Sequence, residues 1–510
     1  MRMKKGSRGI RIQTRILLSG LIILLELYFI VLSVFTFTEG AIWVYTAAEI
    51  ISVITVIHII TERGNQSYKI MWIVFIMAVP VFGVLAYLLW GGGRMFPHLK
   101  KRMIQANKKY FSLLSKDDAQ RAVEYNDMLH YRQAAYLKSE AGLPIYSNTS
   151  SEFLETGERF YSTLLNELKK AQKYIFLEFF ILAQGEMFDG IFKILKEKSE
   201  QGVEIKIIFD DFGSIKRQDK DFIKKLKKAG ISVSVFNPIR PSIDIFMNNR
   251  NHRKIVIIDG EIAFTGGINV GDEYINRLER FGHWLDSGIM LKGEATNSFL
   301  AMFCSMWEFI TQESIDMKSY MCEHNNLNDG FYIPYCDDPL GDTNVAQEIY
   351  MQIIGTAQKY VYITTPYLIL DSSMTSCLCL AAKSGVDVRI ITPHHPDKWY
   401  VHPVTQYYYS ELLDAGVKIY EYTPGFIHSK LFVSDNSIAT VGTVNMDYRS
   451  FNFHFECGVW ISSANSVKTI KESFLETVKH SKQIEIEEWK KRNILKKLKQ
   501  TILHLFAPLM

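Results

Sequence analysis

The sequence is poor in cysteine, with six residues in 510 and no C-x2-C pair among them. Structural zinc sites and disulfide frameworks both need sets of closely spaced cysteines, so we expect neither in this chain. A free cysteine otherwise behaves as a small apolar residue. We therefore expect reduced, mostly buried thiols at Cys304, Cys322, Cys336, Cys377, Cys379 and Cys457.

A strong excess of one charge is also missing. The 58 lysines and arginines nearly balance the 54 aspartates and glutamates, which leaves a net charge of +4. Proteins that bind nucleic acid through its phosphates usually carry a basic groove and stacking aromatic residues. No nucleic-acid partner is expected, whereas a mild basic excess suits anionic lipid or phosphate.

Long apolar runs are absent from most of the chain, but three follow one another near its start, at residues 16–37, 41–60 and 70–90. Each is close to the ~20 residues with which a helix crosses a bilayer. The first run is too long for a signal peptide, and no small-residue cleavage site precedes the second. The sequence predicts a membrane domain over residues 1–95 with three apolar segments.

The orientation of this domain stays open. Six basic residues in the first fifteen place the N-terminus in the cytoplasm, and a second basic cluster after residue 93 places the following end there too. Both ends inside require an even number of spans. Charged residues within the first two runs, such as Glu26 and Glu49, make either run a candidate for a re-entrant segment.

The remainder of the chain contains an internal duplication. The segment Ala171-Gln-Lys-Tyr-Ile-Phe-Leu returns as Ala357-Gln-Lys-Tyr-Val-Tyr-Ile, and Gly202-Val-Glu-Ile-Lys returns as Gly385-Val-Asp-Val-Arg. Several such matches occur in one order, which indicates a duplicated domain. Within the first copy, helical and β-type patterns alternate. We expect an α/β fold with a mostly parallel or mixed sheet covered by helices. The expected helices are 160–170, 189–201 and 221–228, and the expected strands are 174–181, 203–209, 230–236, 254–258 and 388–391.

One polar motif occurs once in each copy. The first copy has His252-x-Lys254-x4-Asp259 and the second has His428-x-Lys430-x4-Asp435, and each is followed at equal spacing by G-[GT]-x-N, ending at Asn269 and Asn445. A single motif of this kind occurs by chance in many proteins, where its histidine is a core or surface residue. Two copies at matching spacing inside a repeat make a shared catalytic site the stronger interpretation.

The motif suits phosphodiester chemistry. Side chains two apart in an extended chain share a face, so each lysine lies beside its histidine. An imidazole can attack phosphorus, and an ammonium neutralises the non-bridging oxygens. The asparagines can hold the same oxygens, and the small glycines allow close approach of the backbone to phosphate. By strand parity, Asp259 and Asp435 face the other way and suit a structural role.

Each histidine also needs an acceptor that orients its other ring nitrogen. The candidates are Asp286 and Glu456, which lie 34 and 28 residues after the histidine of their own copy. Whether each carboxylate serves its own histidine or that of the other copy stays open.

At these residues the chain resembles the phospholipase D superfamily, and more widely the bacterial cardiolipin synthases. The resemblance extends over nearly the whole chain and includes 251–260, 364–367, 447–451 and the third apolar run. It implies two fused lobes with one active site between them, N-terminal transmembrane helices in a bacterial cell membrane, and no metal or cofactor. It also implies that His252, Lys254, Asp259, His428, Lys430 and Asp435 are catalytic and that Asn269 and Asn445 bind phosphate.

The activity implied is transfer of a phosphatidyl group between two phosphatidylglycerol molecules through a phosphohistidine, giving cardiolipin and glycerol. Anionic membrane lipids are then the partners. Either histidine could be the nucleophile, and we favour His252. Hydrolysis by a phospholipase D or a membrane-anchored nuclease uses the same histidines and remains an alternative, as does a non-catalytic scaffold.

The expected order of domains is the membrane domain at 1–95, a basic helical linker at 96–149, a first lobe at 150–320, a second lobe at 321–485 and a basic amphipathic helix at 486–510. In this last helix, leucines and isoleucines recur at helical spacing among lysines. It could lie on a membrane surface or pack on the second lobe.

Overall fold

The computed structural model describes residues 39–62, 65–91, 97–114, 128–239, 249–322, 327–341 and 343–510. The chain divides into two compact units. One contains residues 1–94 with 239–248, and the other contains residues 95–238 with 249–510. The first is called the N-terminal unit below, and the second is called the body.

The N-terminal unit contains α2 (Glu39–Thr61), α3 (Gln66–Ala78), α4 (Pro80–Ala86) and a π-helical turn at Tyr87–Gly91. The second apolar run is thus one helix, but the third, predicted as a single segment, is broken. Pro80 disfavours helical geometry in the residue before it, and Val79 has φ −140° and ψ 78°. The first run lies outside the described residues. None of the helices described combines the length and apolarity needed to cross a bilayer.

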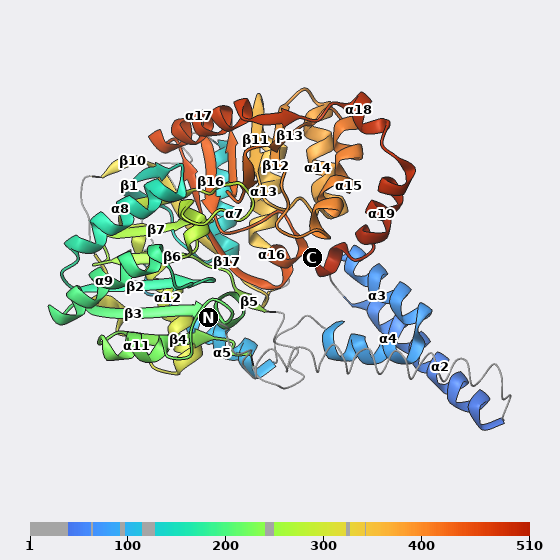
Figure 1. Cartoon of the computed structure of the whole chain (residues 1–510), viewed down its shortest axis with the longest axis horizontal. Helices are drawn as coiled ribbons and strands as arrows, with labels where there is room; N and C mark the ends of the chain where they lie inside the picture. The colour runs from blue at the N-terminus through green and yellow to red at the C-terminus, as the bar shows by residue number, and fades with distance from the viewer. Residues whose placement is uncertain are drawn as a thin grey trace, which may run out of the picture. The chain divides into compact units, whose positions relative to one another are not determined.

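The body is built on one continuous mixed sheet (Figure 1). Its strands follow the spatial order β18-β13-β12-β11-β15-β16-β17-β10-β1-β9-β7-β6-β2-β3-β4. The centre is β1 (Tyr146–Leu154) paired antiparallel with β10 (Asn328–Asp337), and one copy of the repeat extends from each side. The strands of the two lobes are therefore hydrogen-bonded into one sheet.

The strands are these: in the first lobe β2 (Tyr174–Phe179), β3 (Glu204–Asp210), β4 (Ser232–Phe236), β5 (Arg250–Asn251), β6 (Ile255–Ile258), β7 (Ile262–Gly266), β8 (His283–Leu285) and β9 (Gly288–Gly293), and in the second lobe β11 (Tyr360–Thr364), β12 (Asp387–Pro393), β13 (Lys418–Tyr422), β14 (Gly425–Ile427), β15 (Leu431–Ser434), β16 (Ile438–Gly442), β17 (His454–Ser462) and β18 (Ser481–Gln483). In each lobe three strands are parallel, β2-β3-β4 and β11-β12-β13, and their neighbours β6 and β15 run antiparallel to them. The prediction of a mixed α/β sheet is confirmed.

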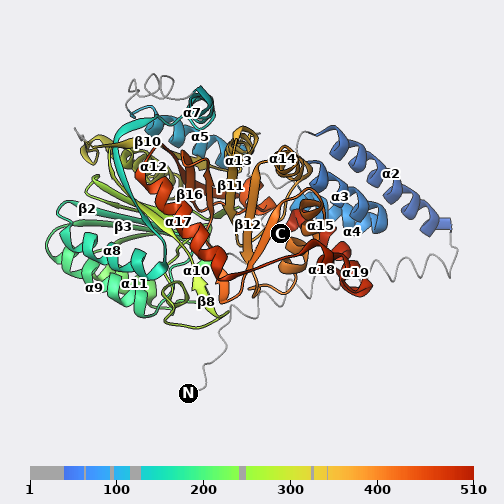
Figure 2. The same ribbon diagram turned by 90° about the horizontal axis from the view of Figure 1, so that it is seen from above.

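Helices cover both faces of the first lobe (Figure 2). Because side chains alternate along a strand, Ile175 and Leu177 of β2 pack with the core beneath α8 (Gly157–Lys170), α9 (Glu186–Glu200) and α11 (Phe222–Lys228). Phe176, between them, stacks on Phe303 of α12 (Thr296–Thr311) at 4.8 Å. Short helices α10 (Asp211–Ser214), η3 (Asp272–Ile275) and η4 (Met317–Ser319) complete the lobe.

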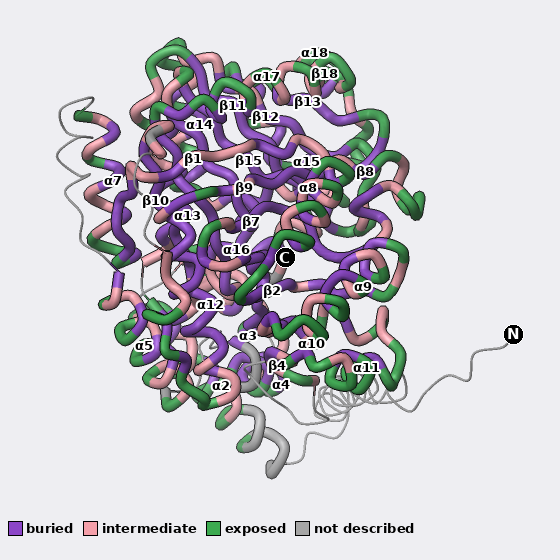
Figure 3. Tube along the Cα trace, turned by 90° about the vertical axis from the view of Figure 1, so that its left-hand side faces the viewer, coloured by how far each residue is buried: buried purple, intermediate pink, exposed green. Residues whose placement is uncertain are grey.

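The second lobe repeats this arrangement. Phe432 of β15 stacks on Tyr350 of α13 (Val345–Thr356) at 4.0 Å. On the other face, Tyr362 of β11 stacks on Phe474 of α17 (Asn465–Lys479) at 4.9 Å. The remaining helices are α14 (Ser372–Lys383), α15 (Val401–Asp414), α16 (Tyr448–Asn452), α18 (Ile486–Lys490), α19 (Ile494–His504) and η5 (Ala507–Leu509). Strands run through the buried interior while helices such as α9 and α11 alternate buried and exposed residues (Figure 3).

The segment predicted as a basic linker contains two helices that pack on the lobes. The first, α5 (Pro97–Phe111), lies against α12, where Lys109 pairs with Glu308 at 2.6 Å. The second, α7 (Met128–Glu140), lies against α13, and its Gln133 accepts a hydrogen bond from the Trp460 indole at 2.9 Å. All six cysteines are free, and four of them are buried, as predicted.

The close approach of β7 to β9 generates a prediction about stability. Gly266 has φ +148°, and a Cβ built on it would lie 2.5 Å from the Gly288 Cα and from the Ser287 carbonyl oxygen. Gly266→Ala should lower the free energy of unfolding by about 2–4 kcal/mol, because backbone cannot move aside as a flexible side chain can. Thermal unfolding of the purified protein measures the effect.

The matched control is Gly355→Ala in α13, where an added Cβ would meet nothing within 4 Å. That substitution should leave stability unchanged or raise it by up to ~1 kcal/mol, the helix propensity difference between alanine and glycine. Equal unfolding temperatures for the two variants would contradict the tight β7–β9 contact.

Candidate active site

Both motif histidines lie in short extended segments that enter the sheet. His252 stands between β5 and β6, and His428 stands between β14 and β15. Both side chains are buried, and so are the two lysines. Lys254 donates to the carbonyl oxygen of His252 at 2.5 Å, and Lys430 donates to that of His428. Each lysine therefore contacts the backbone of the histidine in its own motif.

The backbone at each histidine is bonded to the opposite lobe. β5 runs parallel to the start of β17, and β14 runs parallel to β8. As a result the N–H of His252 donates to the carbonyl of Phe455 at 2.9 Å, and the N–H of His428 donates to the carbonyl of Leu285 at 2.7 Å. The residue after each of these carbonyls is a predicted orienting carboxylate.

The side chains pair crosswise, which answers the question that the sequence left open. The His252 Nδ1 lies 2.9 Å from both carboxylate oxygens of Glu456, in the second lobe. The His428 Nδ1 lies 2.6 Å from Asp286 Oδ2, in the first lobe. A neutral imidazole that donates from Nδ1 presents the lone pair of Nε2 on its other side. Each lobe thus sets the tautomer of the other lobe's histidine.

Burial and neighbouring cations keep these imidazoles neutral. Desolvation is the largest cause that lowers the pKa of His428, to about 4, followed by the charge of Lys430. Desolvation also lowers the pKa of His252 well below its usual value, and the charges of Lys254, Lys430 and His428 lower it further. Because the second motif acts on the pKa of His252, the two motifs form one electrostatic site.

The lysines are affected in the same direction. Burial is the first cause that lowers the pKa of Lys254 to about 7 and that of Lys430 to about 8. An anion that entered between them would favour the charged forms. The site therefore combines uncharged nucleophilic nitrogens with ammonium groups suited to a phosphate.

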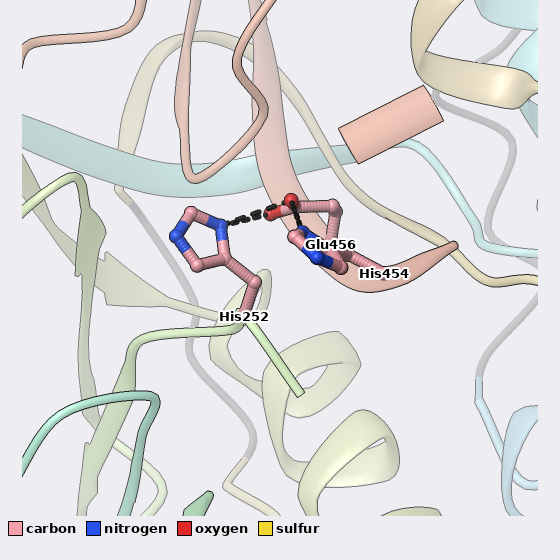
Figure 4. A group of neighbouring side chains, drawn as sticks. All are labelled: His252, His454 and Glu456. Carbon is pink, nitrogen blue, oxygen red and sulfur yellow. Dashed lines mark hydrogen bonds and ion pairs between the residues drawn. The ribbon is translucent and has the colours of Figure 1, made fainter. Parts of the chain in front are cut away.

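The two halves of the site are not equivalent. Glu456 also accepts a hydrogen bond from the Thr443 hydroxyl and lies 3.5 Å from the Nδ1 of His454, so that its carboxylate lies between two imidazoles (Figure 4). In the first lobe the residue in the place of Thr443 is Gly267, where a Cβ would lie 2.1 Å from Asp286 Oδ1. The shorter aspartate fills the space of a side chain, so glycine is required there.

The same group has the composition of a metal site. Among the described residues, His252, His454 and Glu456 bring three ligand atoms within 4.8 Å of one another, and His₂Glu is a ligand set that zinc enzymes use. A cation bound there would replace the hydrogen bond between the Glu456 carboxylate and the His252 Nδ1. The two uses of the group exclude one another.

The motif aspartates are placed away from the histidines. Asp259 lies at the far end of β6 and accepts hydrogen bonds at 2.7–2.8 Å from three backbone N–H groups, those of residues 172–174. Asp435 accepts at 2.7–2.9 Å from those of residues 358–360. At ~3.3 Å per extended residue, neither carboxylate reaches its histidine. The structural role expected from strand parity agrees with this geometry, and the direct catalytic role implied by the resemblance does not.

The motif asparagines and glycines also make internal contacts. The Asn269 side chain accepts from the N–H of Ile181 at 3.0 Å and donates to the Tyr274 hydroxyl at 2.7 Å. The Asn445 Oδ1 is buried and has no hydrogen-bond partner in the part of the chain that is described. Gly266 and Gly442 make room for the neighbouring strand: a Cβ on Gly442 would lie 2.5 Å from the Cys457 carbonyl oxygen.

Two groups near the histidines were not among the predicted site residues. His454 lies two residues before Glu456, a spacing from which strand parity could have predicted a shared face. Asp397 accepts a hydrogen bond from the Tyr367 hydroxyl at 2.5 Å, and Lys398 donates to the same hydroxyl at 3.3 Å. Lys398 contributes to the lowered pKa of His252.

Comparison with known proteins gives matches to both lobes. A family model described as "Cardiolipin synthase, PLD-like domain" matches residues 164–307 and 350–478. A second, described as "Phospholipase_D-nuclease N-terminal", matches residues 50–92. The two matches of the first model correspond to the two copies of the repeat.

Individual relatives extend over most of the chain. A cardiolipin synthase of Halalkalibacterium halodurans is 32% identical over 493 residues, which is 93% of this chain and 96% of the relative. Cardiolipin synthase 2 of Bacillus cereus is 33% identical over 460 residues, 89% of this chain and 88% of the relative. The crystal structure of phosphatidylserine synthase from Haemophilus influenzae has a TM-score of 0.55 at 13% identity, over 74% of this chain and 98% of that one, and shows a likeness of fold.

Crosswise pairing predicts which histidine each carboxylate controls. Glu456→Gln should change the tautomer and ring ¹⁵N shifts of His252 and leave those of His428 unchanged, and Asp286→Asn should do the reverse. An amide keeps the size of the side chain but removes the charge that fixes the donor nitrogen. Each variant should lose about 10²–10⁴-fold in turnover, as other oriented catalytic histidines do.

Histidine-selective ¹⁵N labelling and NMR measure the shifts, with His252→Ala and His428→Ala spectra to assign the signals. A shift of the His428 signals on Glu456→Gln, with His252 unmoved, would contradict the pairing.

Proposed function

The chain belongs to the cardiolipin synthase family, whose lobes are phospholipase D-like, and we propose that it transfers a phosphatidyl group from one phosphatidylglycerol to a hydroxyl of another. The products are cardiolipin and glycerol. The observation that carries this proposal is the pair of buried, neutral imidazoles, each oriented by a carboxylate of the other lobe and each accompanied by a lysine.

In the first step the Nε2 of His252 attacks the phosphorus of phosphatidylglycerol. A nitrogen–phosphorus bond forms and the bond to the glycerol oxygen breaks. The anionic substrate raises the pKa of the buried His428 imidazole, which takes up a proton and gives it to the leaving glycerol oxygen. Lys254 and Lys430 balance the charge on the non-bridging oxygens.

In the second step a hydroxyl of another phosphatidylglycerol enters the space left by glycerol. His428, now neutral, takes the hydroxyl proton while the oxygen attacks phosphorus and the nitrogen–phosphorus bond breaks. This step returns His252 to a neutral imidazole and releases cardiolipin. No external donor of protons or electrons is needed over the cycle.

The assignment of His252 as nucleophile is supported by the asymmetry of the site. Glu456 contacts the His252 Nδ1 with both oxygens and itself accepts a hydrogen bond from the Thr443 hydroxyl. A nucleophile needs a fixed ring and a free lone pair. His428 is held by a single carboxylate oxygen, Asp286 Oδ2, at 2.6 Å, which suits the group that gains and loses a proton.

The N-terminal unit would hold the enzyme in the bacterial cell membrane through the apolar segments at 16–37, 41–60 and 70–90. The match of residues 50–92 to an N-terminal family model supports this. So does the exposure of large apolar side chains along α2, among them Ile50, Ile54 and Ile57. The division of the body into lobes at 150–320 and 321–485, and the roles of Asn269 and Asn445 in holding phosphate, belong to the same proposal.

Product analysis tests transfer against hydrolysis. Purified protein incubated with phosphatidylglycerol alone should release glycerol and form cardiolipin in equal amounts, because each transfer yields one molecule of each. Mass spectrometry of the lipids measures this. His252→Ala and His428→Ala should each lose at least about 10³-fold in rate.

Phosphatidic acid as the main product would show that the enzyme catalyses hydrolysis and would contradict the proposed transfer. Full activity in either histidine variant would remove the shared two-histidine site.

A substrate with an acidic leaving group separates the roles of the two histidines. A p-nitrophenyl phosphatidyl ester needs no proton donor to depart, so His428→Ala should still release one equivalent of p-nitrophenol in a burst. His252→Ala should show no burst, because the attacking nitrogen is gone. The opposite pattern in stopped-flow absorbance would exchange the assigned roles.

A further inference from the structure

The helix at the C-terminal end of the body exposes its apolar side chains and buries a polar one. In α19, Gln500 is 2% exposed, whereas Leu498 is 55% and Ile502 is 49% exposed. Ile494, Leu495, Leu505 and Phe506 are exposed as well. A helix that simply packs on a lobe turns its apolar stripe inward. Here the stripe points to the outside of the body.

The spacing of the residues makes this a single face. Ile494, Leu498, Ile502 and Leu505 are separated by four, four and three residues, so they lie in one row along the helix. Gln500 is two residues from Leu498 and from Ile502, which places it on the opposite side. The outward apolar face consists of Ile494, Leu495, Leu498, Ile502, Leu505 and Phe506 and is called the α19 face below.

Polar and aromatic contacts fix the helix in this orientation. Gln500 donates to Gln406 Oε1 of α15 at 3.4 Å, and Arg492 donates to Gln500 at 3.2 Å. The His504 ring stacks on Tyr407 of α15 at 3.9 Å. Rotating the apolar stripe inward would break all of these contacts. The outward direction of the α19 face is therefore a property of the fold.

The charges in the chain segment that leads into and forms α19 have one sign, and one of them, Lys490, pairs with Asp414 of α15 at 2.9 Å. After Glu488 the chain contains no acidic residue, and it carries six basic ones, Lys490, Lys491, Arg492, Lys496, Lys497 and Lys499. An exposed apolar stripe flanked by lysines is the pattern of a helix that lies in the interface of an anionic bilayer. Each lysine near such a surface adds attraction to anionic lipid.

The α19 face is continuous with the surroundings of the active site. Lys499 lies over the ring of Trp399 at 5.6 Å, and Trp399 is 70% exposed. The preceding residues, Asp397 and Lys398, both contact the Tyr367 hydroxyl. Their charges act on the pKa of Lys430 and of His252. A surface that rests on α19 and Trp399 therefore adjoins the groups that border the catalytic histidines.

We propose that the α19 face, together with Trp399, is a docking surface that inserts into the leaflet of a membrane containing anionic phospholipid. Its apolar side chains enter the boundary between headgroups and acyl chains, and its lysines contact the phosphates. Docking sets Trp399 and the neighbouring groups of the active site against the surface that holds its lipid substrates. This contact depends on α19 and is separate from the transfer chemistry.

A depth probe on the α19 face tests the proposal. The full-length chain carries Leu498→Cys in a background of Cys322→Ser and Cys377→Ser, the two thiols that are not fully buried, and is labelled with an environment-sensitive fluorophore. On reconstitution into vesicles of phosphatidylcholine with phosphatidylglycerol, the emission should shift to the blue and rise several-fold. Brominated lipid should quench it, because bromine on the acyl chain reaches only inserted probes.

Ile223→Cys is the matched control, an isoleucine on α11 of the other lobe that is 36% exposed. Its probe should neither shift nor be quenched in the same vesicles. The shift at Leu498 should persist in a His428→Ala background, so that loss of catalysis and loss of docking are read separately.

The proposal is overturned if the Leu498 probe responds no more than the Ile223 probe. It is also overturned if its shift is identical in detergent and is insensitive to brominated lipid, since the α19 face would then be covered by protein, either a second copy or another part of this chain. The double variant Leu498→Asp/Ile502→Asp should lose at least about tenfold in turnover on vesicles while keeping its turnover in detergent micelles. Equal losses in both would also count against docking.

Discussion

The hydrogen bond between each motif imidazole and a carboxylate of the opposite lobe is the interaction on which the rest of the structure depends. His252 with Glu456, and His428 with Asp286, are buried pairs. Removing one partner would leave a buried polar group without its hydrogen bond, at about 1–3 kcal/mol for each pair. A single lobe contains a histidine without its orienting group. The two copies of the repeat are therefore one functional unit, which explains why a continuous sheet passes through both.

The backbone explains how the crosswise pairs arise. Each motif histidine follows a short strand that pairs with the other lobe, β5 with β17 and β14 with β8. These strand pairings between the lobes bring residue 456 beside residue 252 and residue 286 beside residue 428. Differences between the halves are then tolerated where they compensate, as with Gly267 beside the short Asp286 and Thr443 beside the longer Glu456. Such differences allow two related histidines to take different roles.

Much of the fold and of the candidate site could be predicted from the sequence, because these features depend on local residue patterns and on their recurrence along the chain. The duplication, the mixed α/β sheet, the His-x-Lys pairs and the two candidate carboxylates all follow from local patterns. The crosswise pairing could not be predicted, since it depends on which strands of different copies become neighbours. The break at Val79 was signalled by Pro80 but was hidden within a continuous apolar run. The sequence predicted the apolar stripe of α19, but it could not predict which side of the helix packs on α15. The outward direction of the α19 face is therefore known only from the structure.

The central claim is that both imidazoles act on one phosphorus atom. The most direct measurement is an experimental structure of the full-length protein with vanadate, which mimics the five-coordinate phosphorus of the transition state. The crosswise site predicts a single vanadate bonded to the Nε2 of His252, hydrogen-bonded to the Nε2 of His428, and flanked by Lys254 and Lys430. Vanadate bound at one histidine while the other ring faces a separate cavity would contradict it.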